Sequence, residues 1–267
     1  KAINDTAWGG TELPAEVVAD KNATTFVGYS ELGCDAKLIH IIKADEEGNL
    51  YPEEEAFEND EIIAVFDKTS LYATMGGQVH DNGVITGDGF EASVISVDKD
   101  NSGKFLHKLL ITRGAVRQGA QVRINTDAAM RMAIARNHTA THILQSALKS
   151  VLGNHVEQAG SLVADDRLRF DFNHFQAMTK EEIAKVEAIV NDVVLQDIPV
   201  ITREMAISDA QKLGATALFG EKYGSVVRVV SVGDFDNPFD MEFCGGTHLK
   251  SSGQIGQFRI VSEAGIA

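Results

Sequence analysis

The chain has 267 residues and a formal net charge of −15 at pH 7, and this length allows two domains that each bury a core. The acidity argues against a protein that coats itself in nucleic acid, because phosphate binding depends on Lys and Arg. No apolar run reaches the ~20 residues that a bilayer-spanning helix needs, and residues 1–10 lack a signal-peptide pattern. We therefore predict a cytoplasmic protein without a membrane partner.

The cysteine content excludes a disulfide framework. Only Cys34 and Cys244 are present, and a single thiolate ligand for a metal fits a reducing compartment. The sequence opens on Lys1 rather than Met and stops at Ala267 without a terminal signature. We expect a piece of a longer protein.

From Thr25 to about Asn125 the sequence breaks into short runs that alternate apolar and polar residues between glycine turns. The predicted strands are residues 36–42, 61–66, 89–97, 105–112 and 121–124. This pattern predicts a β-barrel domain over residues 1–125. Inside it, Gly76 and Gly77 precede Gln78, and the two glycines permit a partner to approach the backbone closely. A tight barrel corner explains the same motif, and both interpretations stay open.

After Asn125 the apolar period becomes helical. Thr126 or Asp127 can cap the N-terminus of this helix and Gly153 can end it. One face recurs at steps of three and four residues, and its members are Ile134, His138, Thr141, His142, Gln145, Leu148 and Leu152. His138 and His142 therefore lie one turn apart, the spacing at which a helix presents two imidazoles to one ion.

The remainder alternates strands and helices. We predict a hairpin with strands at residues 155–163 and 167–172, a helix behind the capping box of Thr179 and Glu182, and a short helix from Ser208. Further strands are predicted at residues 225–232 and 255–262. Helices packed on an antiparallel sheet define an α+β second domain over residues 126–267. The fold class predicted for the whole chain is α+β, with the β-barrel first.

A second pair of ligands stands in the turn of Cys244 and His248, which are separated by Gly245, Gly246 and Thr247. Together with the helical histidine pair they form a set that suits Zn²⁺, since magnesium and calcium prefer oxygen ligands. Four protein ligands close a tetrahedral shell, as in structural sites, whereas catalytic zinc keeps one position open. Catalysis would require that one histidine be displaced.

The residues around this set decide the class of chemistry. Between the helical histidines stand Thr139, Ala140 and Thr141, and the missing glutamate excludes the metallopeptidase helix. Glu242 and Gln158 are candidates for proton transfer or substrate contact. Both are equally explained as structural residues of a strand and a hairpin.

Several motifs occur in order along the chain. They are Asn137-His138-Thr139-Ala140-Thr141-His142, Gly160-Ser161-Leu162-Val163, Leu168-Arg169-Phe170-Asp171-Phe172, Ala217-Leu218-Phe219-Gly220-Glu221-Lys222-Tyr223-Gly224 and Cys244-Gly245-Gly246-Thr247-His248. Together they resemble the editing domain of alanyl-tRNA synthetase, and the segment around Gln78 resembles the domain that precedes it. The resemblance runs from about Phe26 to the last residue. It departs from the family pattern at Thr74-Met75, where Glu-Ser is customary, at Phe243 and at Ser252-Gly253.

The resemblance implies a deacylase that hydrolyses tRNA(Ala) mischarged with serine or glycine, with Zn²⁺ held by His138, His142, Cys244 and His248. The implied partners are the acceptor end of that tRNA and the rest of the synthetase chain. No class II active-site motif is present, so ATP-dependent activation of alanine is expected elsewhere in the parent enzyme. The N–H groups of Gly245 and Gly246 are candidates for oxyanion stabilisation.

Serine differs from alanine by one hydroxyl, and Gln158 or Thr139 are the candidates to sense it. Two alternatives stay open beside this interpretation. One is a structural-zinc module that binds RNA without catalysis, and the other is a free-standing trans-editing deacylase. Turnover of mischarged tRNA separates the first alternative from an enzyme.

Overall fold

The computed structural model describes residues 12–217 and 224–265. The chain divides into two compact units, of which the first comprises Lys1–Met75 and Val79–Arg131 and the second comprises Gly76–Gln78 and Met132–Ala267. The sequence predicts one boundary near Asn125. In the structure the main division comes a few residues later, inside a helix, and a three-residue run from the N-terminal half belongs to the second unit.

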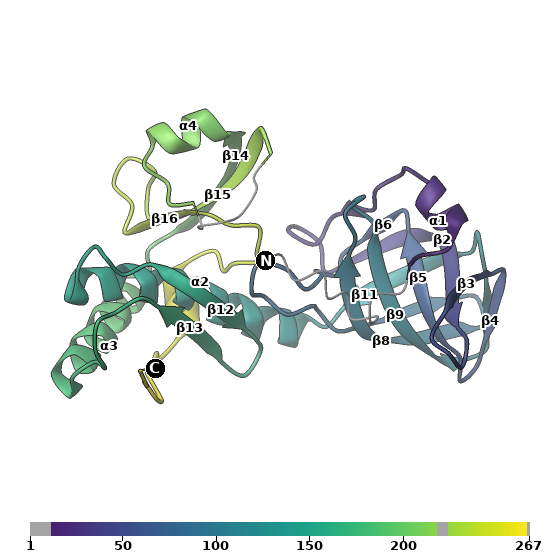
Figure 1. Cartoon of the computed structure of the whole chain (residues 1–267), viewed down its shortest axis with the longest axis horizontal. Coiled ribbons are helices and arrows are strands. Elements are labelled where there is room, and N and C mark those ends of the chain that lie inside the picture. The colour runs from purple at the N-terminus through teal and green to yellow at the C-terminus, as the bar shows by residue number, and fades with distance from the viewer. Residues whose placement is uncertain (1–11, 218–223, 266–267) are drawn as a thin grey trace. The chain divides into compact units, whose positions relative to one another are not determined.

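The first unit is an antiparallel β-barrel (Figure 1). Its strands, in spatial order, are β11 (Gln121–Thr126), β7 (Gly83–Gly87), β8 (Phe90–Lys99), β9 (Phe105–Arg113), β5 (Glu61–Phe66) and β2 (Gly33–Ala44). The sheet closes because β11 pairs with β2 as well as with β7. Alternate side chains along the strands point inward and form the core, as Leu38, Ile85, Phe105 and Leu109 do. The expected α+β class with an N-terminal barrel is confirmed.

Five of the six barrel strands match the sequence prediction. The missed strand, β7, has only five residues and lies between two turn signals, so its alternation is too short to register. Short elements decorate the barrel within the described residues: α1 (Ala15–Ala19), β1 (Thr25–Phe26), β3 (Leu50–Glu53), β4 (Glu55–Phe57), β6 (Lys68–Thr69) and β10 (Ala115–Arg117). Val17 of α1 packs with Ile42 and Val65 in a separate apolar cluster.

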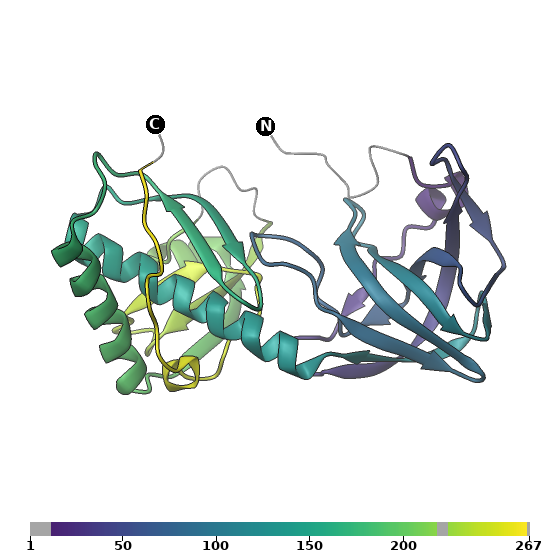
Figure 2. The ribbon, with the colours of Figure 1, turned by 90° about the horizontal axis from the view of Figure 1, so that it is seen from below.

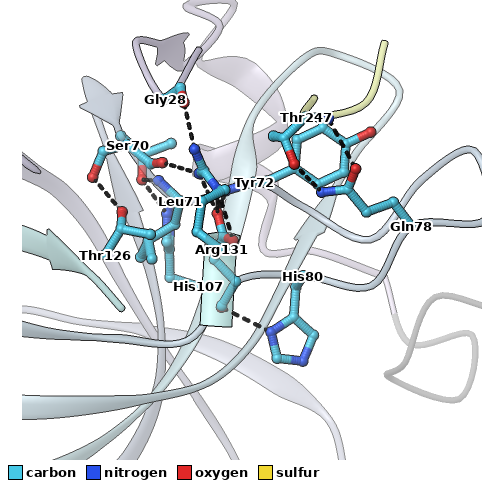
Figure 3. A network of polar contacts seen from close by, with 12 residues as sticks. Gly28, Ser70, Leu71, Tyr72, Gln78, His80, His107, Thr126, Arg131 and Thr247 are labelled. Carbon is cyan, nitrogen blue, oxygen red and sulfur yellow. Dashed lines mark hydrogen bonds and ion pairs between the residues drawn. The ribbon is translucent and has the colours of Figure 1, made fainter. Parts of the chain in front are cut away.

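A buried ion pair organises the end of this unit (Figure 3). Arg131 donates from Nε to Oδ1 of Asp81 at 2.9 Å and from Nη2 to the Ser70 carbonyl at 2.9 Å, and Nη1 reaches the Gly28 carbonyl. The second carboxylate oxygen of Asp81 accepts the Tyr72 N–H at 2.7 Å. Removal of one partner from such a pair leaves a buried charge, at a cost of about 3–5 kcal/mol.

The second unit is built on α2 (Ala128–Leu152). Oδ1 of Asp127 accepts the N–H groups of Ala129 and Met130 at 3.0 Å each, so Asp127 caps this helix. The hairpin of β12 (Gln158–Val163) and β13 (Leu168–Phe172) packs with α2, and so does α3 (Lys180–Leu195); Figure 2 shows the hairpin beside α2 and α3 crossing at an angle near one end of α2. Ile143, Leu148, Val186 and Val190 are among the buried side chains of their common core.

The capping box of Thr179 and Glu182 is confirmed at the start of α3. Further along, β14 (Val200–Ala206), β15 (Val226–Val232) and β16 (Asp240–Phe243) form an antiparallel sheet in that order. The short helix α4 (Ile207–Lys212) begins after Ala206, without a side-chain cap from Ser208. Residues 218–223 of the predicted motif at 217–224 lie outside the described residues.

The strand predicted at residues 255–262 is wrong. The turn η1 (Ser252–Ile255) is followed by extended chain that pairs with no described strand. Its N–H groups bond instead to side chains of α3, since Phe258 N–H donates to Oδ1 of Asn191 at 2.9 Å and Ile260 N–H to Oε1 of Glu187 at 2.6 Å. The apolar alternation suggested backbone hydrogen bonds to a neighbouring strand, but the N–H groups of this segment bond to side chains instead.

Across the described ranges, no helix has both the length and the apolar character needed to cross a bilayer.

The barrel core contains an imidazole that must stay neutral. His107 is fully buried, its Nδ1–H donates to the Ala64 carbonyl at 3.2 Å, and its Nε2 accepts from the Thr69 hydroxyl at 2.9 Å. Burial lowers the pKa of His107 from 6.5 to about 4. Between these two values the unfolded chain binds more protons than the folded one, so folding stability is lost as the pH falls.

We expect acid to destabilise the barrel through His107, by on the order of 3 kcal/mol between pH 7 and pH 4. The His107→Gln variant should be less stable at pH 7 but should lose less stability on acidification. Urea unfolding at both pH values measures this difference. His80→Gln, at a half-buried position of the same unit, is the control and should keep the wild-type slope. Equal slopes for His107→Gln and wild type would contradict the assignment.

Candidate metal centre

The four predicted ligands come together in the second unit. The helix α2 carries His138 and His142 one turn apart, and the turn after β16 carries Cys244 and His248. The prospective ligand atoms of all four side chains lie within 4.8 Å of one another. Two segments that are distant in sequence therefore form one compact cluster.

The separations within the cluster suit a tetrahedral ion. The Cys244 Sγ atom lies 3.4 Å from Nε2 of His138 and 3.3 Å from Nε2 of His248. Bond lengths of about 2.3 Å for Zn–S and about 2.0–2.1 Å for Zn–N put sulfur and nitrogen about 3.6 Å apart on a tetrahedral edge. The donor set and its spacing both fit Zn²⁺.

Electrostatics around the sulfur favour the thiolate form that a metal requires. Burial raises the pKa of the Cys244 thiol, but the neighbouring imidazoles, His138 foremost, hold it well below the usual value of 9. Burial and the charge of His138 lower the pKa of His248 to about 3. A thiolate beside a neutral imidazole is the state in which these groups bind a cation.

Two of the imidazoles are oriented by oxygen atoms on the side away from the ligand atoms. The Nδ1 atom of His142 lies 3.1 Å from Oδ2 of Asp240, whose other oxygen accepts from the Ser146 hydroxyl at 2.7 Å. The Nδ1 atom of His248 lies 3.1 Å from Oγ1 of Thr139. Such partners fix the tautomer and the angle of a ligating ring.

The third imidazole, that of His138, contacts Gln78 of the Gly76-Gly77-Gln78 motif. Oε1 of Gln78 lies 2.7 Å from Nδ1 of His138. Gln78 was noted in the sequence for its glycine neighbours only, without a link to the metal ligands.

Glu242, a predicted catalytic candidate, lies next to the cluster. One carboxyl oxygen is 3.6 Å from Nδ1 of His142, and Oε1 has no hydrogen-bond partner among the described residues. Burial and the carboxylate of Asp240 raise the pKa of Glu242 to about 8.

The glycines of the ligand turn have distinct places. Gly245 is exposed, whereas Gly246 is buried and its N–H donates to Sγ of Cys244 at 3.4 Å. Arg228 donates from Nη1 to the carbonyls of Cys244 and Gly246 at 2.8 Å each and so fixes the turn. In this structure the Gly246 N–H is engaged by the sulfur.

Gln158 is the predicted site residue that the structure links to the hairpin rather than to the ligands by hydrogen bonding. It begins β12 and pairs with Phe172, whereas Val163 at the other end of the strand pairs with Gln78. Five residues of strand span about 16 Å. Within the described residues, no hydrogen bond joins the Gln158 side chain to a candidate ligand.

Sequence reasoning missed Asp240 and Arg228. Asp240, Glu242 and Cys244 alternate along β16 and its extension, so they share one face. The two-residue spacing from Cys244 could have predicted that Asp240 lies on the same face of the strand as the cysteine. Nothing in the sequence marked Arg228, which sits on the neighbouring strand β15 opposite the turn.

Comparison with known proteins gives two family matches. Residues 7–130 match the model described as tRNA synthetases class II (A), and residues 227–267 match the threonyl and alanyl tRNA synthetase second additional domain. The alanine–tRNA ligase of Acetivibrio thermocellus is 51% identical over 249 residues, which cover 93% of this chain and 27% of the relative. That of Pseudothermotoga lettingae is 46% identical over 266 residues, which cover 100% of this chain and 29% of the relative. The chain thus spans little more than a quarter of the length of these relatives.

The cluster predicts that zinc stabilises the second unit. A ligand that binds only the folded state adds about 2.7 kcal/mol when its free concentration is 100 times its Kd. We expect thermal unfolding of this unit to shift upward with zinc and downward with a chelator, and His142→Ala should remove most of the shift. Calorimetry with and without chelator measures it. His155→Ala, at an exposed histidine of the same unit, should respond like wild type, and an equal response from His142→Ala would refute the site.

Proposed function

Since the chain belongs to the alanyl-tRNA synthetase family, we propose that its second unit is an editing site that hydrolyses tRNA(Ala) carrying serine or glycine. The observation that carries this proposal is the convergence of three imidazoles and one thiolate within 4.8 Å. The ligase activity, the tRNA partner and the remaining chain belong to the longer relatives, and we propose them for the parent enzyme of this chain.

In the proposed centre His138, His142, Cys244 and His248 hold Zn²⁺. When bound, zinc supplies Lewis acidity that polarises the ester carbonyl between the amino acid and the terminal ribose. The protein contributes orientation, because Asp240 fixes the ring of His142. A closed four-ligand shell leaves no position for substrate, so the proposed reaction requires that one histidine move aside.

The other candidate residues act mainly by positioning in this proposal. Thr139 is fully buried and its hydroxyl oxygen serves His248 and the Leu249 N–H. Glu242 faces the outer nitrogen of His142, where its protonation state sets the charge beside that ring. Gln158 is proposed to contact parts of the substrate that extend along β12. The exposed turn at Gly245 is proposed to face the developing oxyanion.

The need for such a site follows from the chemistry of the amino acids. A pocket sized for alanine cannot strongly exclude the smaller glycine, and serine adds only one hydroxyl. A second site that acts on the wrong esters supplies the missing discrimination. This is the class of reaction that we propose for the metal centre.

A structural-zinc module that binds RNA is the second candidate function. The observation that favours it is the closed shell of four protein ligands, two of them buried on α2. Such a module would bind tRNA with strong salt dependence and would release no amino acid.

We expect the purified, zinc-loaded chain to release serine from Ser-tRNA(Ala) and glycine from Gly-tRNA(Ala), and to spare Ala-tRNA(Ala). Cys244→Ala should lower the rate at least ~100-fold, because loss of a ligand removes the charge stabilisation at the carbonyl. Release of labelled amino acid measures the rate.

The control is Cys34→Ala, which alters the only other cysteine, in the barrel core, and should leave the rate unchanged. Circular dichroism establishes that both variants are folded. Binding of tRNA without release of serine by wild type would support the structural module. Full activity of a folded Cys244→Ala chain would remove this residue from the reaction.

A further inference from the structure

Gln78 is fully buried and belongs, with Gly76 and Gly77, to the second unit, although the residues on both sides of this run belong to the first unit. It pairs with Val163 of β12 in a parallel bridge, and the Val163 N–H donates to the Gly77 carbonyl at 2.8 Å. Gly77 has φ +81°, and a Cβ there would come within 2.8 Å of the Ser161 carbonyl oxygen. The glycine is thus required for the backbone to run against β12 and to deliver Gln78.

The orientation of the Gln78 amide follows from its partners. The N–H of Thr247 points at Oε1 from 2.9 Å, and a backbone N–H can only donate, so this atom must be the oxygen. The amide nitrogen then donates to Oγ1 of Thr247 at 2.9 Å. Figure 3 shows Gln78 and Thr247 facing each other with both bonds drawn.

This orientation fixes the proton of a metal ligand. Because Oε1 can only accept, Nδ1 of His138, at 2.7 Å, must carry the hydrogen. In the neutral form, the ring with its hydrogen on Nδ1 presents the lone pair of Nε2, which lies 3.4 Å from Sγ of Cys244. His138 is therefore held in the tautomer that a metal needs at this position.

The ligand turn is shaped to admit this contact. A Cβ on Gly246 would lie 1.9 Å from Cε1 of His138 and 2.8 Å from Oε1 of Gln78. The second glycine of the turn therefore leaves the space in which the imidazole and the amide meet. The glycine pairs of the two motifs have complementary roles, since Gly77 delivers the amide and Gly246 makes room for its contact with His138.

We infer that Gln78 is a positioning residue of the metal centre, which fixes the tautomer of His138 and ties it to the ligand turn through Thr247. This inference rests on the proposed metal site but not on the proposed hydrolysis. A barrel-corner role alone would not require a buried amide bonded at both of its ends.

The test is the zinc affinity of the full chain, measured by competition with a chromophoric chelator. Gln78→Met keeps the length of the side chain but removes the amide, and loss of a partner to a ligating histidine weakens binding by about 10- to 100-fold. Gln78→Glu keeps an oxygen for His138 Nδ1–H and should bind zinc within about threefold of wild type. Gln196→Met, at an exposed glutamine that ends α3, should bind like wild type.

A second measurement separates positioning from general loss of structure. In the metal-bound wild type, nitrogen NMR of the histidine rings should show the His138 proton on Nδ1, and Gln78→Met should lose this signature while the signals of the barrel histidines remain. Cobalt substitution should retain the thiolate charge-transfer band of Cys244 in Gln78→Met but should alter the d–d bands.

The outcomes distinguish this inference from the metal site itself. If wild type binds no zinc, the metal site fails and the role of Gln78 falls with it. If wild type binds zinc and Gln78→Met binds it equally well with an unchanged His138 tautomer, only the role of Gln78 is refuted. Weakened zinc binding by Gln78→Met, recovered in Gln78→Glu, would support it.

Discussion

The second unit depends on one constraint, which is that a thiolate and three imidazoles share a space only a few ångströms wide. Polar groups removed from water are costly unless each has a partner. The structure meets this requirement with three different oxygen donors or acceptors, since an amide serves His138, a carboxylate serves His142 and a hydroxyl serves His248. A bound cation would satisfy the groups that remain inside the cluster.

The four side chains of the cluster differ in their exposure to solvent. His138 and His142 are buried on the helix, whereas Cys244 and His248 are half-buried and Gly245 beside them is exposed. Access for a bound ion would therefore come from the side of the turn. Among the three imidazoles, only His248 has a hydroxyl as the hydrogen-bond partner of its Nδ1 atom. His142 has a carboxylate there, and His138 has an amide that is itself hydrogen-bonded to Thr247, so the ring of His248 is held least firmly. It is the ligand that the surroundings oppose least if one must move aside.

The four residues of the cluster could be picked out from the sequence because their signals are local. The one-turn spacing of His138 and His142 and the glycine turn around Cys244 can be read without knowledge of the fold. The barrel strands were predictable for the same reason, except for the short β7. What escaped prediction depends on contacts between distant segments, such as Arg228 on the turn carbonyls or the side chains of α3 that bond the extended C-terminal segment. Gln78 was noticed, but its partners lie 60 and 169 residues further along.

The placement of Gly76–Gln78 has a consequence for how the chain can be divided. Because this run belongs to the second unit while residues on both sides of it belong to the barrel, no single cleavage point yields two complete modules. A C-terminal half produced alone would contain all four candidate ligands and lack the Gln78 amide that contacts one of them. The two units are therefore interleaved in the sequence, and any recombination that exchanges the second unit whole must also exchange these three codons.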